Sequence, residues 1–218
     1  MKPSPRTERL VWTLTLVLSA IGVIAVLARL FRLGAPPRGT DTGFAEHPLL
    51  TAIHILPGLL FVVLAPLQFV RALRKGRLHR WLGRALVAVG LVIGVSALLM
   101  SAQMSIGGLT ETTATMSFGA LFLFCLVRGF VAIRRRQIAQ HREWMLRAFA
   151  IGMAVAFIRP IVGIFFATSR LTHLTPRDFF GIAFWLGFVI QTSVAELWIR
   201  ATSKRTPVLA RHEATLQK

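Results

Sequence analysis

Two short segments of the chain combine residue types that suit haem chemistry. Apart from one inserted residue, both contain His-Arg, then Trp, then Arg three residues later: His79-Arg80-Trp81-Leu82-Gly83-Arg84 and His141-Arg142-Glu143-Trp144-Met145-Leu146-Arg147. Two opposed imidazoles can bind a haem iron from both sides. Nearby guanidinium groups can bind the haem propionates, and the segments supply Arg80, Arg84, Arg142 and Arg147. The chain has no Cys-x-x-Cys-His motif, so these segments predict a non-covalent haem b.

The spacing of the two segments predicts a second pair of ligands. His141 follows His79 by 62 residues, and Met116 follows His54 by the same interval. His and Met form the other common pair of axial haem ligands. The alternative is that His54 and Met116 are packing residues, and that His79 and His141 contact lipid headgroups at the membrane surface.

Three further charged residues lie inside apolar stretches, where a charge rarely faces lipid. Arg159 follows His141 by 18 residues, or five helical turns, so both lie on one face of a helix. We expect Arg159 to contact a haem propionate or another anion; the alternative is a hydrogen bond to helix carbonyls or to Gln191. Arg128 and Glu196 lie at similar depths and predict a structural ion pair, with a proton or ion path as the alternative.

Six apolar stretches must position these residues, and they occupy residues 10–33, 49–73, 85–107, 113–133, 144–168 and 179–200. Each has about 20 residues or slightly more, which spans a hydrocarbon core of roughly 30 Å as a helix. A backbone inside a bilayer must satisfy its own hydrogen bonds, so each stretch is expected to be helical. The sequence therefore predicts an all-α, polytopic membrane protein with a single transmembrane domain over residues 1–218. The repeated segments predict that spans two to five form a duplicated four-helix core.

The basic residues predict the orientation of the chain. If the N-terminus is cytoplasmic, 19 of the 26 Lys and Arg residues lie on the inside and five lie on the outside. This bias places both termini, and a basic tail over residues 201–218, in the cytoplasm. The net charge of +18 then suits anionic lipid headgroups on the cytoplasmic face, and nucleic acid is not expected as a partner.

The motifs together resemble those of an uncharacterised bacterial integral-membrane family, domain of unknown function 2306, over residues 50–165. The similarity rests on these residues: His54, His79-Arg80, Gly83-Arg84, the His141-x-x-Trp144-Met145-x-Arg147 run and Arg159. It implies a small multi-pass protein of the bacterial inner membrane, with no established activity. The histidines on spans two, three and five are also similar to those of cytochrome b561-type four-helix cores. Those cores have a fourth histidine on the helix that matches span four, and this chain lacks it.

Three functions are compatible with these residues. The first is transmembrane electron transfer through haem b, which requires a redox partner. The second is the binding or transport of a small anion or lipid headgroup by intramembrane arginines. The third is a non-catalytic membrane subunit. Hydrolase chemistry is not expected, because the sequence has no Gly-x-Ser-x-Gly, Walker or His-Glu-x-x-His motif.

Overall fold

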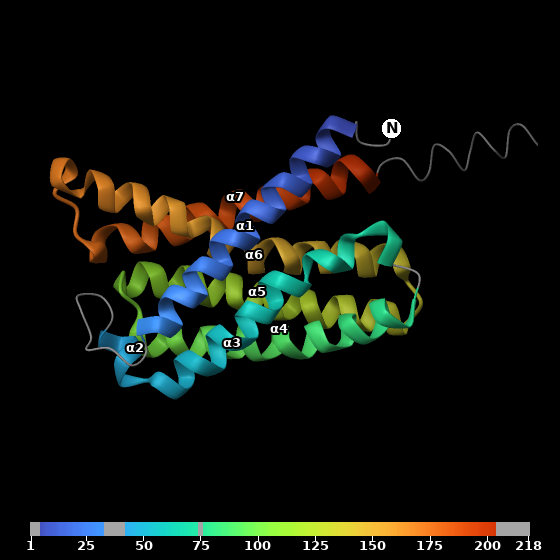
Figure 1. Cartoon of the computed structure of the whole chain (residues 1–218), viewed down its shortest axis with the longest axis horizontal. Coiled ribbons are helices and arrows are strands. Elements are labelled where there is room, and N and C mark those ends of the chain that lie inside the picture. Colours follow the sequence, from blue (N-terminus) through green and yellow to red (C-terminus); the bar gives the residue numbers. More distant parts are fainter. Residues whose placement is uncertain (1–4, 33–41, 74–75, 204–218) are drawn as a thin grey trace, which may run out of the picture.

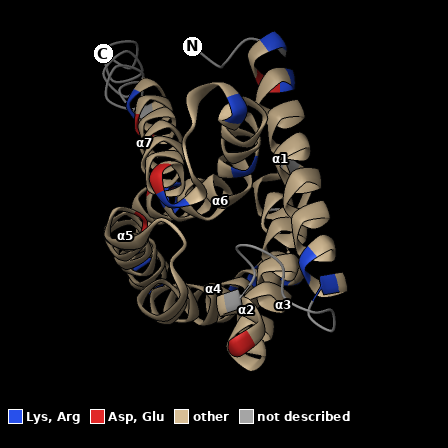
Figure 2. Cartoon of the chain, turned by 90° about the vertical axis from the view of Figure 1, so that its left-hand side faces the viewer, with Lys and Arg blue, Asp and Glu red and all other residues tan. Residues whose placement is uncertain are grey.

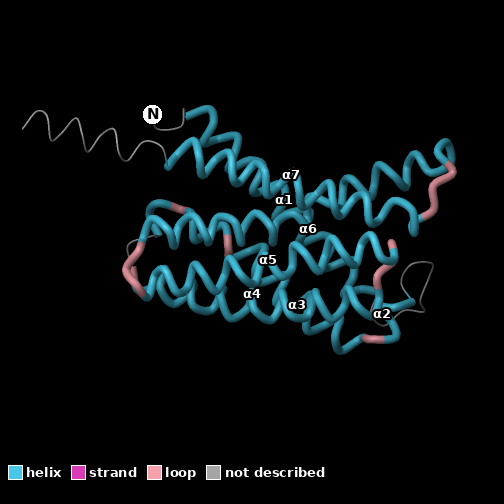
Figure 3. The backbone as a smooth tube through the Cα atoms, turned by 180° about the vertical axis from the view of Figure 1, so that it is seen from behind, coloured by secondary structure: helices cyan, strands magenta, loops and turns pink. Residues whose placement is uncertain are grey.

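Long helices account for most of the structure, a computed structural model that describes residues 5–32, 42–73 and 76–203 (Figure 1). The helices are α1 (Pro5–Arg32), α2 (Thr42–Glu46), α3 (Pro48–Leu64), α4 (Arg77–Met104), α5 (Gly108–Arg134), α6 (Ile138–Thr172) and α7 (Pro176–Ser203). Two 3₁₀ turns, Pro66–Phe69 and Arg71–Leu73, follow α3. These described ranges contain no strand (Figure 3).

Six of the helices, all except α2, are long and apolar enough to cross a membrane. This confirms the all-α, polytopic fold. Some boundaries differ from the predicted spans. The second span leaves the α-helical conformation after Leu64, because Pro66 has no N–H with which to continue the helical hydrogen bonds. The predicted tail begins inside α7, and its residues 204–218 lie outside the described part of the chain.

Helices α1, α3, α4, α5 and α6 surround a common axis (Figure 2). Helices α3, α4, α5 and α6 each pack against the next one along the chain, and α1 packs against both α3 and α6. Helix α7 lies outside this circle against α5 and α6. The consecutive packing of α3 to α6 is compatible with a duplicated hairpin, and the duplication itself stays a prediction.

The two ends of the bundle differ in what they contain. Helix α1 begins and α7 ends at the same end, which we call the terminal end; the short helix α2 lies at the opposite end, which we call the α2 end (Figure 1). Helices α4 and α6 therefore begin at the terminal end, and α3 and α5 begin at the α2 end. This alternation brings residues from distant parts of the sequence to the same depth.

Two phenylalanines fill the circle of helices between these ends. Phe61 of α3 and Phe122 of α5 are buried, and their rings meet edge to face with centroids 5.9 Å apart. Glycines on the facing helices make room for them: a Cβ added at Gly152 would lie 2.6 Å from the Phe61 ring, and one at Gly94 would lie 3.2 Å from the Phe122 ring. We call these four residues the waist, because side chains from α3 and α5 meet the backbones of α4 and α6 there.

Candidate functional site

Arg159 is the most unusual charged residue of the bundle. It lies seven residues after Gly152 on α6, which is two helical turns and about 10 Å toward the α2 end. Because Gly152 faces the waist, Arg159 faces the axis on the α2 side of it. The residue lies deep among the helices, yet its side chain is exposed rather than packed. This combination leaves accessible space beside the guanidinium group.

Three other helices place polar groups near this guanidinium. Glu111 of α5 and Arg29 of α1 are close enough to Arg159 for a charge–charge interaction, and so is His54 of α3. We call Arg29, His54, Glu111 and Arg159 the polar cluster. It joins four helices of the circle at one depth, although its members are far apart in the sequence.

The orientation of His54 is set by a serine on α4. His54 Nδ1 and Ser96 Oγ lie 2.9 Å apart, and Ser96 Oγ donates its hydrogen to the Val92 carbonyl oxygen at 2.6 Å. A hydroxyl has one hydrogen, so Ser96 accepts the hydrogen bond from His54 Nδ1–H. This arrangement leaves His54 Nε2 as an acceptor for another group.

The other two members of the polar cluster have fixed positions as well. The buried Glu111 accepts a hydrogen bond from the backbone N–H of Gly107, directly before α5. The guanidinium of Arg29 stacks over the ring of Phe44 on α2, 4.0 Å from the ring centroid. The polar cluster thus contains two guanidinium groups and one carboxyl group.

Arg159 differs from these neighbours because it has no direct partner among the described residues. It makes no hydrogen bond or ion pair with residues 5–32, 42–73 or 76–203. The expected alternatives, a bond to helix carbonyls or to Gln191, are therefore absent from this part of the chain. A guanidinium has five N–H donors, and leaving them unsatisfied at membrane depth is costly. The arrangement suits an anion with acceptor oxygens. Within the same ranges no group of three or more His, Cys, Asp or Glu residues is placed to hold a metal ion.

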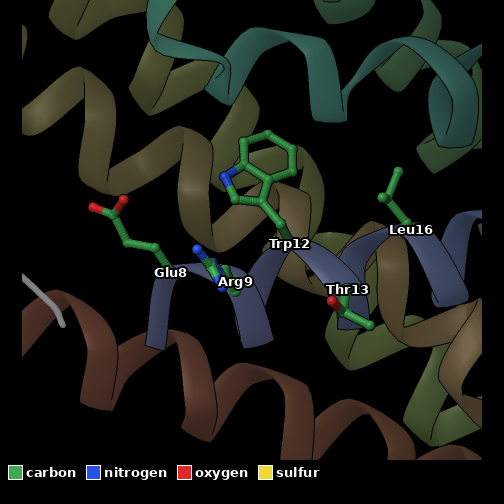
Figure 4. A pocket seen from close by; sticks show the side chains of 5 residues that line it. All are labelled: Glu8, Arg9, Trp12, Thr13 and Leu16. Carbon is green, nitrogen blue, oxygen red and sulfur yellow. The ribbon is translucent and has the colours of Figure 1, made fainter. Parts of the chain in front are cut away.

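A shallow hollow at the terminal end is separate from this cluster. Its volume is about 450 Å³, and its lining residues come from the beginning of α1: Glu8, Arg9, Trp12, Thr13 and Leu16 (Figure 4). A tryptophan beside charged residues is typical of the boundary between lipid and water. We therefore interpret this hollow as part of the interfacial surface.

The predicted haem ligands lie at two different depths. At the terminal end, His141 Nδ1 donates to the Gly129 carbonyl oxygen at 2.8 Å, and His79 lies in the first turn of α4 with a buried Nδ1. Helix α5 lies between α4 and α6 and packs against both. On the α2 side of the waist, His54 contacts Ser96 and the Ile93 backbone on α4, and Arg159 lies within range of a charge–charge interaction. The second predicted ligand there, Met116, is half-buried on α5. Haem binding stays a prediction.

The predicted propionate ligands have different surroundings. Arg80, Arg84 and Arg142 are exposed at the terminal end, and Arg84 lies 5.9 Å from the Trp81 ring centroid on its own helix. Arg147, in contrast, binds the carboxylate of Glu196.

The ion pair of Glu196 is a correction to the sequence analysis. Glu196 of α7 binds Arg147 of α6 in place of Arg128. Arg147 Nε donates to Oε1, and Arg147 Nη2 donates to Oε2 at 3.1 Å. The reason is geometric: α7 packs against the face of α6 that contains Arg147, whereas Arg128 of α5 lies over the Trp144 ring. The predicted pair of Arg128 and Glu196 rested on their similar depths along the helices, and depth does not determine which helix faces meet.

The comparisons with known proteins agree with this picture. A family model described as "Predicted membrane protein (DUF2306)" matches residues 51–199. The chain belongs to this family. No curated protein matches the chain, and no solved structure does. The resemblance noted in the sequence is therefore confirmed, and the match extends through most of α7. In this DUF2306 protein, three members of the polar cluster lie inside the matched region, and Arg29 lies before it.

Sequence reasoning missed two members of the polar cluster. Glu111 was assigned to a loop, because the predicted fourth span began at residue 113; in the structure α5 begins at Gly108 and includes it. Arg29 is one of the five basic residues that the predicted topology places on the outside. An acidic residue within one turn of a long apolar stretch was the available signal, since such a residue can still be helical and buried.

Proposed function

We propose that this DUF2306 protein binds a small oxyanion in the polar cluster, reached from the α2 end of the bundle. The observation that supports this most directly is Arg159. Its side chain is exposed at the axis of the circle and has no hydrogen bond or ion pair within the described residues. A carboxylate or phosphate oxygen would satisfy donors that the described part of the protein leaves open.

The neighbouring residues add charged and hydrogen-bonding groups to the site. Arg29 places a second guanidinium near Arg159, and Glu111 places a carboxyl group there. His54 Nε2 is available to accept a hydrogen bond from a hydroxyl of the ligand. The same oxyanion chemistry belongs to a free solute or to a lipid headgroup. Passage of either across the membrane would require Phe61 and Phe122 to separate, because these rings close the circle at the waist.

The proposal is tested by thermal unfolding of the purified protein in detergent. Inorganic phosphate and acetate represent free anions, dihexanoyl phosphatidylglycerol represents a lipid headgroup, and chloride at equal ionic strength is the reference. A ligand at 100 times its Kd stabilises a protein by about 2.7 kcal/mol. We expect Arg159→Gln to abolish this stabilisation.

Arg170→Gln is the matched control, because Arg170 is exposed in the last turn of the same helix. It should retain the stabilisation by the anion that acts on the natural protein. Equal stabilisation of the natural protein and of Arg159→Gln would overturn the proposal. A response confined to the lipid would identify a headgroup as the ligand, and a response to phosphate or acetate would identify a free anion.

A second candidate function is electron transfer through a haem b held by His79 and His141. It is supported by the repeated segments and by the bond from His141 Nδ1 to Gly129, since metal-bound histidines commonly donate their other ring N–H to a carbonyl. A visible absorption spectrum of protein purified from haem-supplemented cells tests it. We expect a Soret band that His141→Ala removes, and a colourless natural protein would exclude this function.

The orientation forms part of the proposal. We infer a bacterial inner-membrane protein with the terminal end in the cytoplasm, supported by the distribution of 19 basic residues against five. A reporter fused after Lys218 should be active only if it functions in the cytoplasm. Activity of a periplasmic reporter at this position would reverse the orientation, and the polar cluster would then open to the cytoplasm.

A further inference from the structure

A second arginine without a hydrogen bond or ion pair among the described residues lies on the other side of the waist, on the surface of the bundle. Arg128 of α5 is exposed, and its guanidinium lies 5.5 Å from the centroid of the Trp144 ring and 6.0 Å from that of the Phe124 ring. These two rings meet edge to face at 5.5 Å. Two aromatic side chains thus hold the guanidinium by cation–π contacts. Arg128 has no hydrogen bond or ion pair with the described parts of the chain.

A neighbouring arginine shows what is missing at Arg128. The guanidinium of Arg147 also lies over Trp144, 4.7 Å from the ring centroid, but Glu196 neutralises it through two hydrogen bonds. Of the two guanidinium groups at this tryptophan, one therefore has a carboxylate, whereas the other has aromatic contacts and no carboxylate partner among the described residues. A single negative charge at Arg128 would complete the arrangement.

The surroundings of Arg128 are apolar and exposed, which distinguishes a lipid from a soluble anion. Phe124 is 51% exposed and Val127 is 50% exposed, and both lie within one helical turn of Arg128 on α5. Arg128 lies six residues before the end of α5, which is about 9 Å along the helix axis. Tryptophan and arginine at this depth are typical of the boundary between acyl chains and headgroups.

We propose that an anionic phospholipid binds at the surface of α5 and α6 at the terminal end, in a site formed by Phe124, Arg128 and Trp144. Its phosphate accepts hydrogen bonds from the exposed Arg128 guanidinium, and its acyl chains lie along Phe124 and Val127. The negative charge of the headgroup balances the arginine, as Glu196 balances Arg147. This site is independent of the polar cluster, which lies beyond the waist.

Native mass spectrometry of the whole protein in detergent tests the proposal, with phosphatidylglycerol or phosphatidylcholine of identical acyl chains added. We expect the natural protein to retain phosphatidylglycerol in preference to phosphatidylcholine. Arg128→Gln should weaken the binding of phosphatidylglycerol about tenfold, the effect of losing one charge-assisted hydrogen bond. Arg128→Lys, which keeps the charge but loses the planar donors, should give an intermediate loss.

Two controls separate this site from other sources of the signal. Arg134→Gln removes an exposed charge from the last turn of the same helix and should change phosphatidylglycerol binding less than twofold. Arg159→Gln should also leave it unchanged, so the test does not depend on the proposed function. The proposal is overturned if Arg134→Gln weakens binding as much as Arg128→Gln. It is also overturned if phosphatidylcholine binds equally well, or if inorganic phosphate displaces phosphatidylglycerol.

Discussion

Arg147 and Arg159 lie on the same helix, twelve residues apart, on opposite sides of the waist. Arg147 is partly buried, binds both carboxylate oxygens of Glu196 and stacks on Trp144. Arg159 faces the axis and interacts with Glu111 and the other members of the polar cluster only at longer range. The difference indicates two roles for a charge at membrane depth. A guanidinium with its own carboxylate joins two helices, whereas one without a direct partner is available to a ligand.

The regions around the two arginines differ in the same way. Near Arg147, close helix packing is accompanied by direct hydrogen bonds, as between His141 and the Gly129 carbonyl. Gly129 permits this approach, since a Cβ there would lie 2.2 Å from Met145. Near Arg159, polar groups of three other helices lie within range of a charge–charge interaction, but none of the described residues bonds directly to its guanidinium. Stability and ligand binding are therefore expected to depend on different halves of the bundle.

The largest effect is expected at the waist that separates the halves. Phe122→Ala removes a ring that is 3% exposed and in contact with Phe61, which should lower the free energy of unfolding by about 3 kcal/mol or more. Denaturant titration in detergent measures this loss. Phe31→Ala is the control, because Phe31 is 92% exposed on α1 and should change stability little. A Phe122 variant as stable as the natural protein would mean that the waist is not a packed layer.

Loss of the ion pair between Arg147 and Glu196 is expected to have the next largest effect on the free energy of unfolding. Glu196→Gln leaves the partly buried Arg147 without its carboxylate, which should cost about 1–3 kcal/mol. Unfolding of the double variant with Arg147→Gln should show that the two losses are not additive, because both remove one interaction. Glu46→Gln is the control on the exposed helix α2. Additive losses would mean that the two residues do not stabilise the protein as a pair.

Substitution of Arg159 is expected to change the free energy of unfolding in the opposite direction. In the absence of an anion, Arg159→Gln should raise the free energy of unfolding by about 1 kcal/mol, because the substitution removes donors that have no direct partner in the described part of the chain. Thermal unfolding in a buffer that contains only chloride measures the change. A loss of stability comparable to that of Glu196→Gln would contradict the comparison, since it would assign Arg159 a structural role.

The smallest effect is expected at the serine that orients His54. Ser96→Ala removes the hydrogen bond from His54 Nδ1, and such bonds between membrane helices contribute about 0.6 kcal/mol on average. We expect a loss of this size, together with weaker anion binding, because the imidazole is then free to rotate. Ser117→Ala, on the exposed face of α5, serves as the control for both measurements. Unchanged anion binding would exclude an orienting role for Ser96.

The prediction of six membrane helices needed only the sequence, because a bilayer imposes one solution on any long apolar stretch. The same reasoning identified Arg159 as a residue that does not face lipid, since a charge at that depth requires polar surroundings. This reasoning did not identify Glu111 as a helical, buried residue, because hydropathy marks the ends of the hydrocarbon region and not the ends of helices. Helix α6 likewise begins at Ile138, six residues before the predicted span.

The partners of the charged residues were decided only by the tertiary structure. Depth along a helix follows from residue number, so the sequence placed Arg128 and Glu196 in one layer. Which faces meet depends on how six helices pack, and between membrane helices this packing rests on shape and on small residues such as Gly129 and Gly152 rather than on a hydrophobic pattern. Lipid-facing and buried positions are both apolar here, so the sequence has no polar face from which to read the packing. For this reason Glu196 of α7 pairs with Arg147 of α6. Arg159 lies at the axis of the circle of helices and has no direct partner in the described residues.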